Sequence, residues 1–189
     1  MKNISVLAVI VSLFASCSGG SKKILVMLSG SADITGNTIH LQPGTTHNEM
    51  TFTPDGDSIT VISPSQTKGF SVKDRGYYLL NLKKDTIAGA YQHVGTDNAQ
   101  QVISQENLRA RIDSLNQLMH GANVSGKARN YNLPPFTLAK ITDNTDAQII
   151  GPYVKLPGSF DPSREHEIYK FYTNKEIMDI VTRSNKMIQ

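Results

Sequence analysis

The sequence predicts an α+β fold in which a mainly antiparallel, curved sheet or partial barrel carries two amphipathic helices, at about residues 104–120 and 174–188. Two observations predict this class. Short apolar or alternating segments, separated by Gly, Pro, Asp and Ser, fill most of residues 23–94, which is typical of consecutive strands. The apolar period then changes to that of a helix after residue 101, and again after residue 173.

The strand segments suggest two local pairings. Residues 49–53 and 58–61 alternate on either side of Pro54-Asp55-Gly56-Asp57, and Asp-Gly between alternating segments predicts a tight hairpin. Residues 76–82 and 86–94 predict a second antiparallel pair, turned by residues 83–85. The remaining strand candidates are residues 23–28, 38–42, 136–142, 148–155 and 168–172.

Both helices carry an apolar stripe and recognisable ends. In the first, Ser104 is the expected N-cap and Gly121 the expected stop, and the stripe is formed by Leu108, Ile112, Leu115 and Met119. In the second, Thr173 and Glu176 form a capping box, which satisfies free amides of the first turn. Its stripe is formed by Ile177, Ile180, Val181, Ser184 and Ile188.

Composition excludes several classes of protein. The chain has 189 residues, with 19 Lys and Arg against 16 Asp and Glu, and a formal net charge of +3. This net charge is lower than is typical of disordered chains, and the sequence has no basic stripe that would indicate binding to nucleic acid. The single cysteine forms neither an internal disulfide nor a cysteine-based zinc site.

The first seventeen residues resemble a targeting segment. A positively charged start precedes an apolar run, residues 4–14, that is too short to cross a bilayer and is typical of a signal peptide. Phe14-Ala15-Ser16-Cys17 places two small residues directly before the only cysteine. This pattern resembles the lipobox of bacterial membrane lipoproteins, although Phe14 stands where leucine is commonest. The resemblance implies cleavage before Cys17, a diacylglycerol on its thiol, and a fatty acid such as palmitate on its new amine.

The organisation expected from this resemblance has three parts. Residues 1–16 are a signal peptide, residues 17–23 are the lipidated cysteine and a flexible Gly/Ser tether, and residues 24–189 are a single globular domain. Ser18 is not the aspartate linked to inner-membrane retention, and no acidic run follows Cys17. By resemblance, both observations favour an outer membrane, on its periplasmic side. Beyond Cys17 the chain is similar only to short, uncharacterised lipoproteins of Bacteroidota.

Motifs that carry chemistry are absent from the sequence. Five histidines occur, at positions 40, 47, 93, 120 and 166, and none has the spacing of a zinc-binding pair. Residues 143–146 are rich in oxygen ligands, but Ala147 stands where a calcium loop needs its third ligand, so we expect a turn there. Ser65-Gln66-Thr67-Lys68 lacks the partner elements of penicillin-recognising enzymes. The sequence therefore predicts no metal and no cofactor.

These observations favour a non-catalytic binding or accessory module, anchored to the membrane through lipid on Cys17. Its partner would be an envelope protein or a small ligand, and Tyr77, Tyr78 and Tyr91 are the expected contact surface. The alternatives are a structural accessory of the envelope and a small periplasmic hydrolase with a site assembled from distant residues. The hydrolase would bring a Ser or Asp side chain against one of the five histidines.

Overall fold

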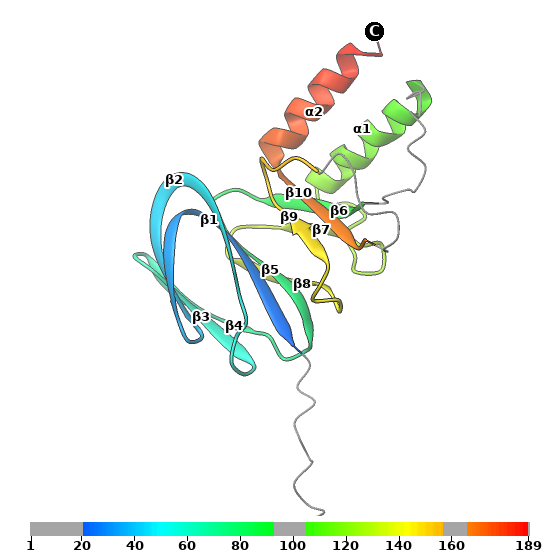
Figure 1. Cartoon of the computed structure of the whole chain (residues 1–189). Coiled ribbons are helices and arrows are strands. Elements are labelled where there is room, and N and C mark those ends of the chain that lie inside the picture. Colours follow the sequence, from blue (N-terminus) through cyan, green and yellow to red (C-terminus); the bar gives the residue numbers. More distant parts are fainter. Residues whose placement is uncertain (1–20, 93–104, 157–165, 189) are drawn as a thin grey trace, which may run out of the picture.

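The computed structural model describes residues 21–92, 105–156 and 166–188, and it confirms the α+β class (Figure 1). The two helices are α1 (Gln105–Met119) and α2 (Asn174–Lys186), within two residues of the expected bounds at each end. The strands are β1 (Lys22–Thr35), β2 (Thr38–Phe52), β3 (Ser58–Ser63), β4 (Gln66–Ser71), β5 (Gly76–Leu82), β6 (Ile87–Gln92), β7 (Asn130–Leu133), β8 (Thr137–Thr142), β9 (Gln148–Ile150) and β10 (Ile168–Thr173).

The strands form two sheets. The larger has the order β4-β3-β2-β1-β5-β8, and the smaller has the order β7-β6-β10-β9. Most neighbours are antiparallel, as expected, but β1 with β5, β2 with β3, and β9 with β10 are parallel. Both sheets are therefore mixed. β1 and β5 are separated along the chain by three other strands, whereas β2 with β3 and β9 with β10 are consecutive strands that still run parallel.

Neither of the two predicted hairpins exists. Gly56 has the expected positive φ, +98°, but residues 49–52 pair with β1, and β3 runs parallel to the start of β2. The hairpin lies instead at Thr35–Thr38, between the long strands β1 and β2. Residues 83–85 do not turn β5 onto β6 either, because they carry the chain from one sheet to the other.

The larger sheet is strongly curved because β1 and β2 bend together. Their register shifts between Ser29 and Gly30, and Gly30 has a φ of +106°. A Cβ on Gly30 would overlap the Gln42 carbonyl and lie 2.8 Å from the carbonyl carbon of Pro43, so only glycine allows this close approach. The curl brings the sheet edges together, since the Lys68 amine donates to the Phe136 carbonyl at 2.8 Å. The expected partial barrel is confirmed as a nearly closed sheet.

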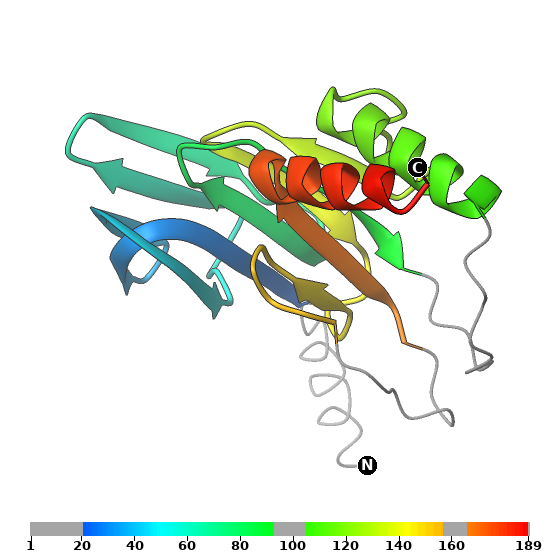
Figure 2. The same cartoon turned by 90° about the horizontal axis from the view of Figure 1, so that it is seen from above.

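Three apolar cores hold the layers together. The first fills the curl of the larger sheet, the second lies between the two sheets, and the third lies between the smaller sheet and the helices. In the third, Ile177 and Leu118 pack against Ala88, and both helices cover the outer face of the smaller sheet (Figure 2). The predicted capping box of Thr173 and Glu176 is present at the start of α2. Ser104, the expected N-cap of α1, lies outside the described residues.

The expected boundary between tether and domain needs a correction. Lys22 and Lys23 already belong to β1, where they pair with Gly76 and Tyr77 of β5. The Lys22 amine also donates to Asp57 at 2.5 Å, and the Lys23 amine donates to the Thr145 carbonyl at 3.3 Å. Because both residues pair with β5 and both amines have partners in the sheet region, the globular domain includes Lys22 and Lys23.

Candidate functional site

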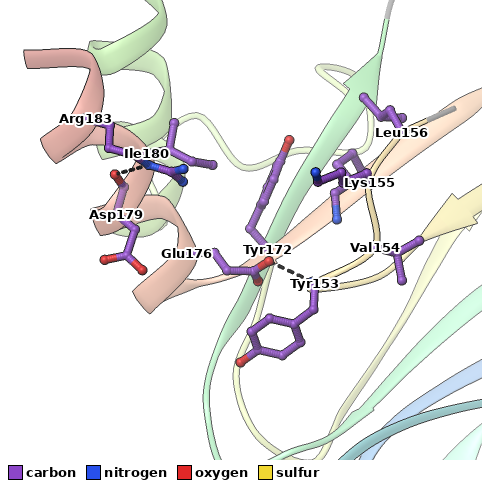
Figure 3. A pocket seen from close by; sticks show the side chains of 10 residues that line it. Tyr153, Val154, Lys155, Leu156, Tyr172, Glu176, Asp179, Ile180 and Arg183 are labelled. Atoms are coloured by element: carbon purple, nitrogen blue, oxygen red, sulfur yellow. Dashed lines mark hydrogen bonds between the residues drawn. The ribbon is translucent and has the colours of Figure 1, made fainter. Parts of the chain in front are cut away.

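A pocket of about 340 Å³ lies where α2 and β10 meet the segment that follows β9 (Figure 3). Its volume is near the lower end of the range of small-molecule sites, about 300–1,000 Å³. Side chains from three elements converge on it. They are Tyr153, Val154, Lys155 and Leu156 of the segment, Lys170 and Tyr172 of β10, and Glu176, Asp179, Ile180 and Arg183 of α2.

The segment of residues 151–156 forms one wall of the pocket, and Glu176 holds it in place. The Tyr153 amide donates to Glu176 Oε1 at 2.7 Å, and the other oxygen of Glu176 accepts from the Thr173 amide at 2.9 Å. Glu176 therefore has two roles, because one oxygen caps α2 and the other fixes the wall. The apolar rim of this wall is unusually exposed, at 58% for Tyr153, 48% for Val154 and 37% for Leu156.

Lys170 lies at the base of the pocket and is only 4% exposed. Its amine donates to the carbonyls of Gly151 and Phe171, the latter at 2.9 Å, and lies 4.6 Å from the centre of the Tyr172 ring. Among the residues that the structure describes, no carboxylate forms an ion pair with this amine. Burial lowers the pKa of Lys170, although Glu176 and Glu49 oppose that shift.

A second buried lysine lies behind the same wall. The Lys83 amine, on a residue 4% exposed, donates to Ser29 Oγ at 3.2 Å and lies 3.2 Å from His47 Nδ1. His47 Nε2 in turn lies 2.8 Å from Glu49 Oε1. We call these four residues the Lys83 cluster. Burial also lowers the pKa of Lys83, and nearby carboxylates, Asp85 first, oppose that shift.

Tyr153 connects the pocket with the Lys83 cluster. Its ring centre lies 5.4 Å from that of His47, edge to face, and 5.8 Å from the Lys83 amine. Gly151, two residues earlier, packs so closely on Glu49 that a Cβ would overlap Glu49 Oε1. The wall of the pocket thus lies directly on the Lys83 cluster.

Two kinds of chemistry are available to this arrangement. The pocket offers a buried amine, an exposed apolar rim and the Arg183 guanidinium, which together suit an anionic ligand with an apolar part. The Lys83 cluster offers a hydroxyl beside a lysine of lowered pKa, which is the pairing of a Ser-Lys nucleophile. No group of three or more His, Cys, Asp or Glu suited to a metal ion occurs within residues 21–92, 105–156 and 166–188.

The expected tyrosine surface is wrong for two of its three members. Tyr77 and Tyr78 are each 5% exposed. Alternation does send them to opposite faces of β5, but this strand is covered on both faces, with Tyr78 in the first core and Tyr77 in the second. Tyr91 is half-buried, with the Arg129 guanidinium 4.6 Å from its ring centre. Cys17 lies outside the described residues.

His47 comes near the hydrolase expectation without meeting it directly. Its hydrogen-bond partners are Glu49 and Lys83, and it reaches the Ser29 hydroxyl only through Lys83. His93 lies outside the described residues. Residues 143–146 form the expected turn between β8 and β9, with the Ala147 amide bonded to the Asn144 carbonyl at 3.3 Å.

Sequence reasoning missed the two lysines on which both sites depend. For Lys170 a signal was present, because a charged residue between Tyr169 and Phe171 in an apolar strand is placed where burial is expected. For Lys83 there was none, since it lies in a polar turn and is buried only because Ser29, His47 and Tyr153 surround it. No known protein family, curated protein or solved structure matches this chain.

Proposed function

We propose that the chain is a lipid-anchored binding module of a bacterial envelope, and that it binds its partner or ligand in the pocket between residues 151–156 and α2. The observation that carries this proposal is the pairing of a buried Lys170, whose amine forms no ion pair with any described residue, with an exposed apolar rim. A buried charge without a counter-ion destabilises a fold. It is therefore more easily explained by a ligand than by packing. In this proposal the module has no catalytic activity of its own and needs no cofactor or nucleic acid.

The anchor is Cys17, by the resemblance of residues 14–17 to a lipobox, and the proposed location is the periplasmic side of an outer membrane. A thiol that carries diacylglycerol would hold the chain stably, because two or more acyl chains are enough for a lasting anchor. β1 begins at the lower end of the molecule in Figure 1, whereas the helices lie at the upper end. The tether would thus leave the pocket open to a partner. Within the described ranges, no helix is long and apolar enough to span a membrane.

In-cell photo-crosslinking tests the proposal. A photoreactive amino acid replaces Leu156, on the rim, or Ile62, an equally exposed residue of β3 that serves as the matched control. Crosslinks at position 156 that are absent at position 62, and that decrease in a Cys17→Ala background, are the expected result, since tethering raises the effective concentration of a membrane partner. Equal crosslinking at both positions would count against the pocket. Wild-type protein recovered in the soluble fraction would count against the anchor.

A small hydrolase is the second candidate, and the Lys83 cluster favours it. In such a reaction neutral Lys83 would take the proton of Ser29 as Oγ attacks the acyl carbon of an ester. The departing alcohol would regain that proton, and water would then release the acid from Ser29. Purified Cys17→Ala protein is assayed with p-nitrophenyl butyrate. Turnover that is lost in Ser29→Ala and Lys83→Met, yet kept in the exposed control Ser31→Ala, would favour the hydrolase over the binding module.

A further inference from the structure

We infer that the pocket binds a single carboxylate attached to a short apolar group, with the carboxylate on Lys170 and Arg183 and the apolar part on Tyr172, Ile180 and Leu156. This inference rests on the proposed function, because it names the ligand chemistry of the same pocket. Three features of the lining residues carry it: an incompletely used amine, the balance of charge, and the arrangement of apolar side chains.

The amine of Lys170 has capacity for one more acceptor. An ammonium has three N–H donors, and two of them go to the carbonyls of Gly151 and Phe171. Among the described residues no other acceptor is hydrogen-bonded to this amine, and the centre of the Tyr172 ring lies 4.6 Å from it. A carboxylate oxygen entering the pocket would take the third donor and supply the missing counter-ion, and charge-assisted hydrogen bonds of this kind are the stronger ones.

Charge balance selects a singly charged head group. Three cations line the pocket, Lys155, Lys170 and Arg183, against two carboxylates, Glu176 and Asp179, which leaves one positive charge in excess. Glu176 is already occupied by the Tyr153 amide and the Thr173 amide. Arg183 donates to its own helix only through Nε, to the Asp179 carbonyl at 3.1 Å, so its other donors remain for a ligand (Figure 3). A dianion such as a phosphate monoester would be repelled by the two carboxylates.

The exposed apolar residues of the rim indicate that the ligand has an apolar part. Val154 and Leu156 are exposed at 48% and 37%, and they line the same pocket as Ile180 and Tyr172. A volume of about 340 Å³ leaves room for a short chain or one branched side chain beyond the head group. Because burial of each CH₂ group removes apolar surface from water, an acid without a chain would bind much more weakly.

Isothermal titration calorimetry of the full chain carrying Cys17→Ala tests the inference with matched probes. These are hexanoate, hexanamide as the neutral head group, acetate as the head group without a chain, and hexyl phosphate as the dianion. Hexanoate should bind at least tenfold more tightly than each of the others. N-acetyl-leucine, which resembles a peptide C-terminus, separates the two sources of a carboxylate: tighter binding of it indicates a peptide end, and tighter binding of hexanoate indicates a free acid.

Variants then assign the contacts. Lys170→Met should weaken hexanoate binding at least tenfold, and Arg183→Gln, on an exposed residue, should weaken it severalfold even if the first variant folds poorly. Lys140→Met removes a cation that already pairs with Asp143 away from the pocket, and it should change nothing. Equal binding of hexanoate and hexanamide, unchanged affinity in both pocket variants, or no saturable binding would overturn the inference. Crosslinks at position 156 without hexanoate binding would overturn it while leaving the proposed function standing.

Discussion

Gly151 occupies a position where any side chain would displace the Glu49 carboxylate. A Cβ there would lie 2.6 Å from Glu49 Cδ and 2.9 Å from Met27 Cε. The easiest relief is rotation of Glu49 away from His47, which breaks the 2.8 Å hydrogen bond between them. Such a bond to a charged group contributes about 1.5–3 kcal/mol. Partial exposure of both side chains reduces that value, and alanine recovers about 0.4–1 kcal/mol through the unfolded chain. We expect Gly151→Ala to lower the free energy of unfolding by about 1 kcal/mol.

A double-mutant cycle with Glu49→Ala tests the cause of that loss. In this background no carboxylate meets the new Cβ, so Gly151→Ala should cost about 1 kcal/mol less than it does in the wild type. Urea unfolding gives the four free energies, and unchanged m values would show that the denatured state is the same. Gly69→Ala is the matched control, because the space around its Cβ is empty and its φ is ordinary. Additive free energies would refute the proposed contact between Gly151 and Glu49.

Three further predictions concern the curl, the Asp-Gly turn and the buried lysine. Gly30→Ala should destabilise the fold by at least about 2 kcal/mol in urea unfolding, because it adds a backbone overlap to a positive φ, whereas Gly36→Ala, in open space, should cost only about 1 kcal/mol. Gly56→Val should cost about 1–2 kcal/mol through its φ of +98°, and a loss below about 0.5 kcal/mol would mean that the turn does not need glycine. Burial lowers the pKa of Lys170 in the folded chain below its ordinary value of 10.5. At pH values between the folded-state pKa and 10.5, the unfolded chain therefore binds more protons than the folded chain, and the contribution of Lys170 to the free energy of unfolding rises with pH. The unfolding free energy of the wild type minus that of Lys170→Met should therefore increase from neutral pH to about pH 10, and a difference independent of pH would contradict the burial of a charged lysine.

Patterns among neighbouring residues predicted the helices, but they did not predict which strands, distant in the sequence, pair with each other. The stripe and capping box of α2 depend on residues a few positions apart, so residues 173–188 alone are enough to predict them. The Asp-Gly hairpin failed because the competing partner of residues 49–52 is β1, more than twenty positions earlier. Alternation predicts a strand but does not say which strand lies beside it, and the same limit made β5 and β6 look like a pair.

The candidate site was hidden for the same reason. Tyr77 and Tyr78 were expected at a surface, but Tyr78 is buried in the core inside the curl of the larger sheet, and Tyr77 is buried in the core between the two sheets. Lys83 and Lys170 lie far apart in the sequence. Both contact the segment after β9, because Tyr153 lies beside the Lys83 amine and the Gly151 carbonyl accepts from the Lys170 amine. No spacing rule links such residues.

Contacts of Tyr153 fix the wall of the pocket. The φ of Tyr153, +66°, is disfavoured for a residue with a side chain by roughly 1–2 kcal/mol, and such strain persists only where surrounding contacts determine the conformation. Those contacts come from both sides: Glu176 accepts the Tyr153 amide, and the ring packs on His47 beside the Lys83 amine. The wall is therefore held in place before a ligand arrives. Since ordering a loop on binding costs affinity, a wall already fixed in this way leaves more of the contact energy for the ligand itself.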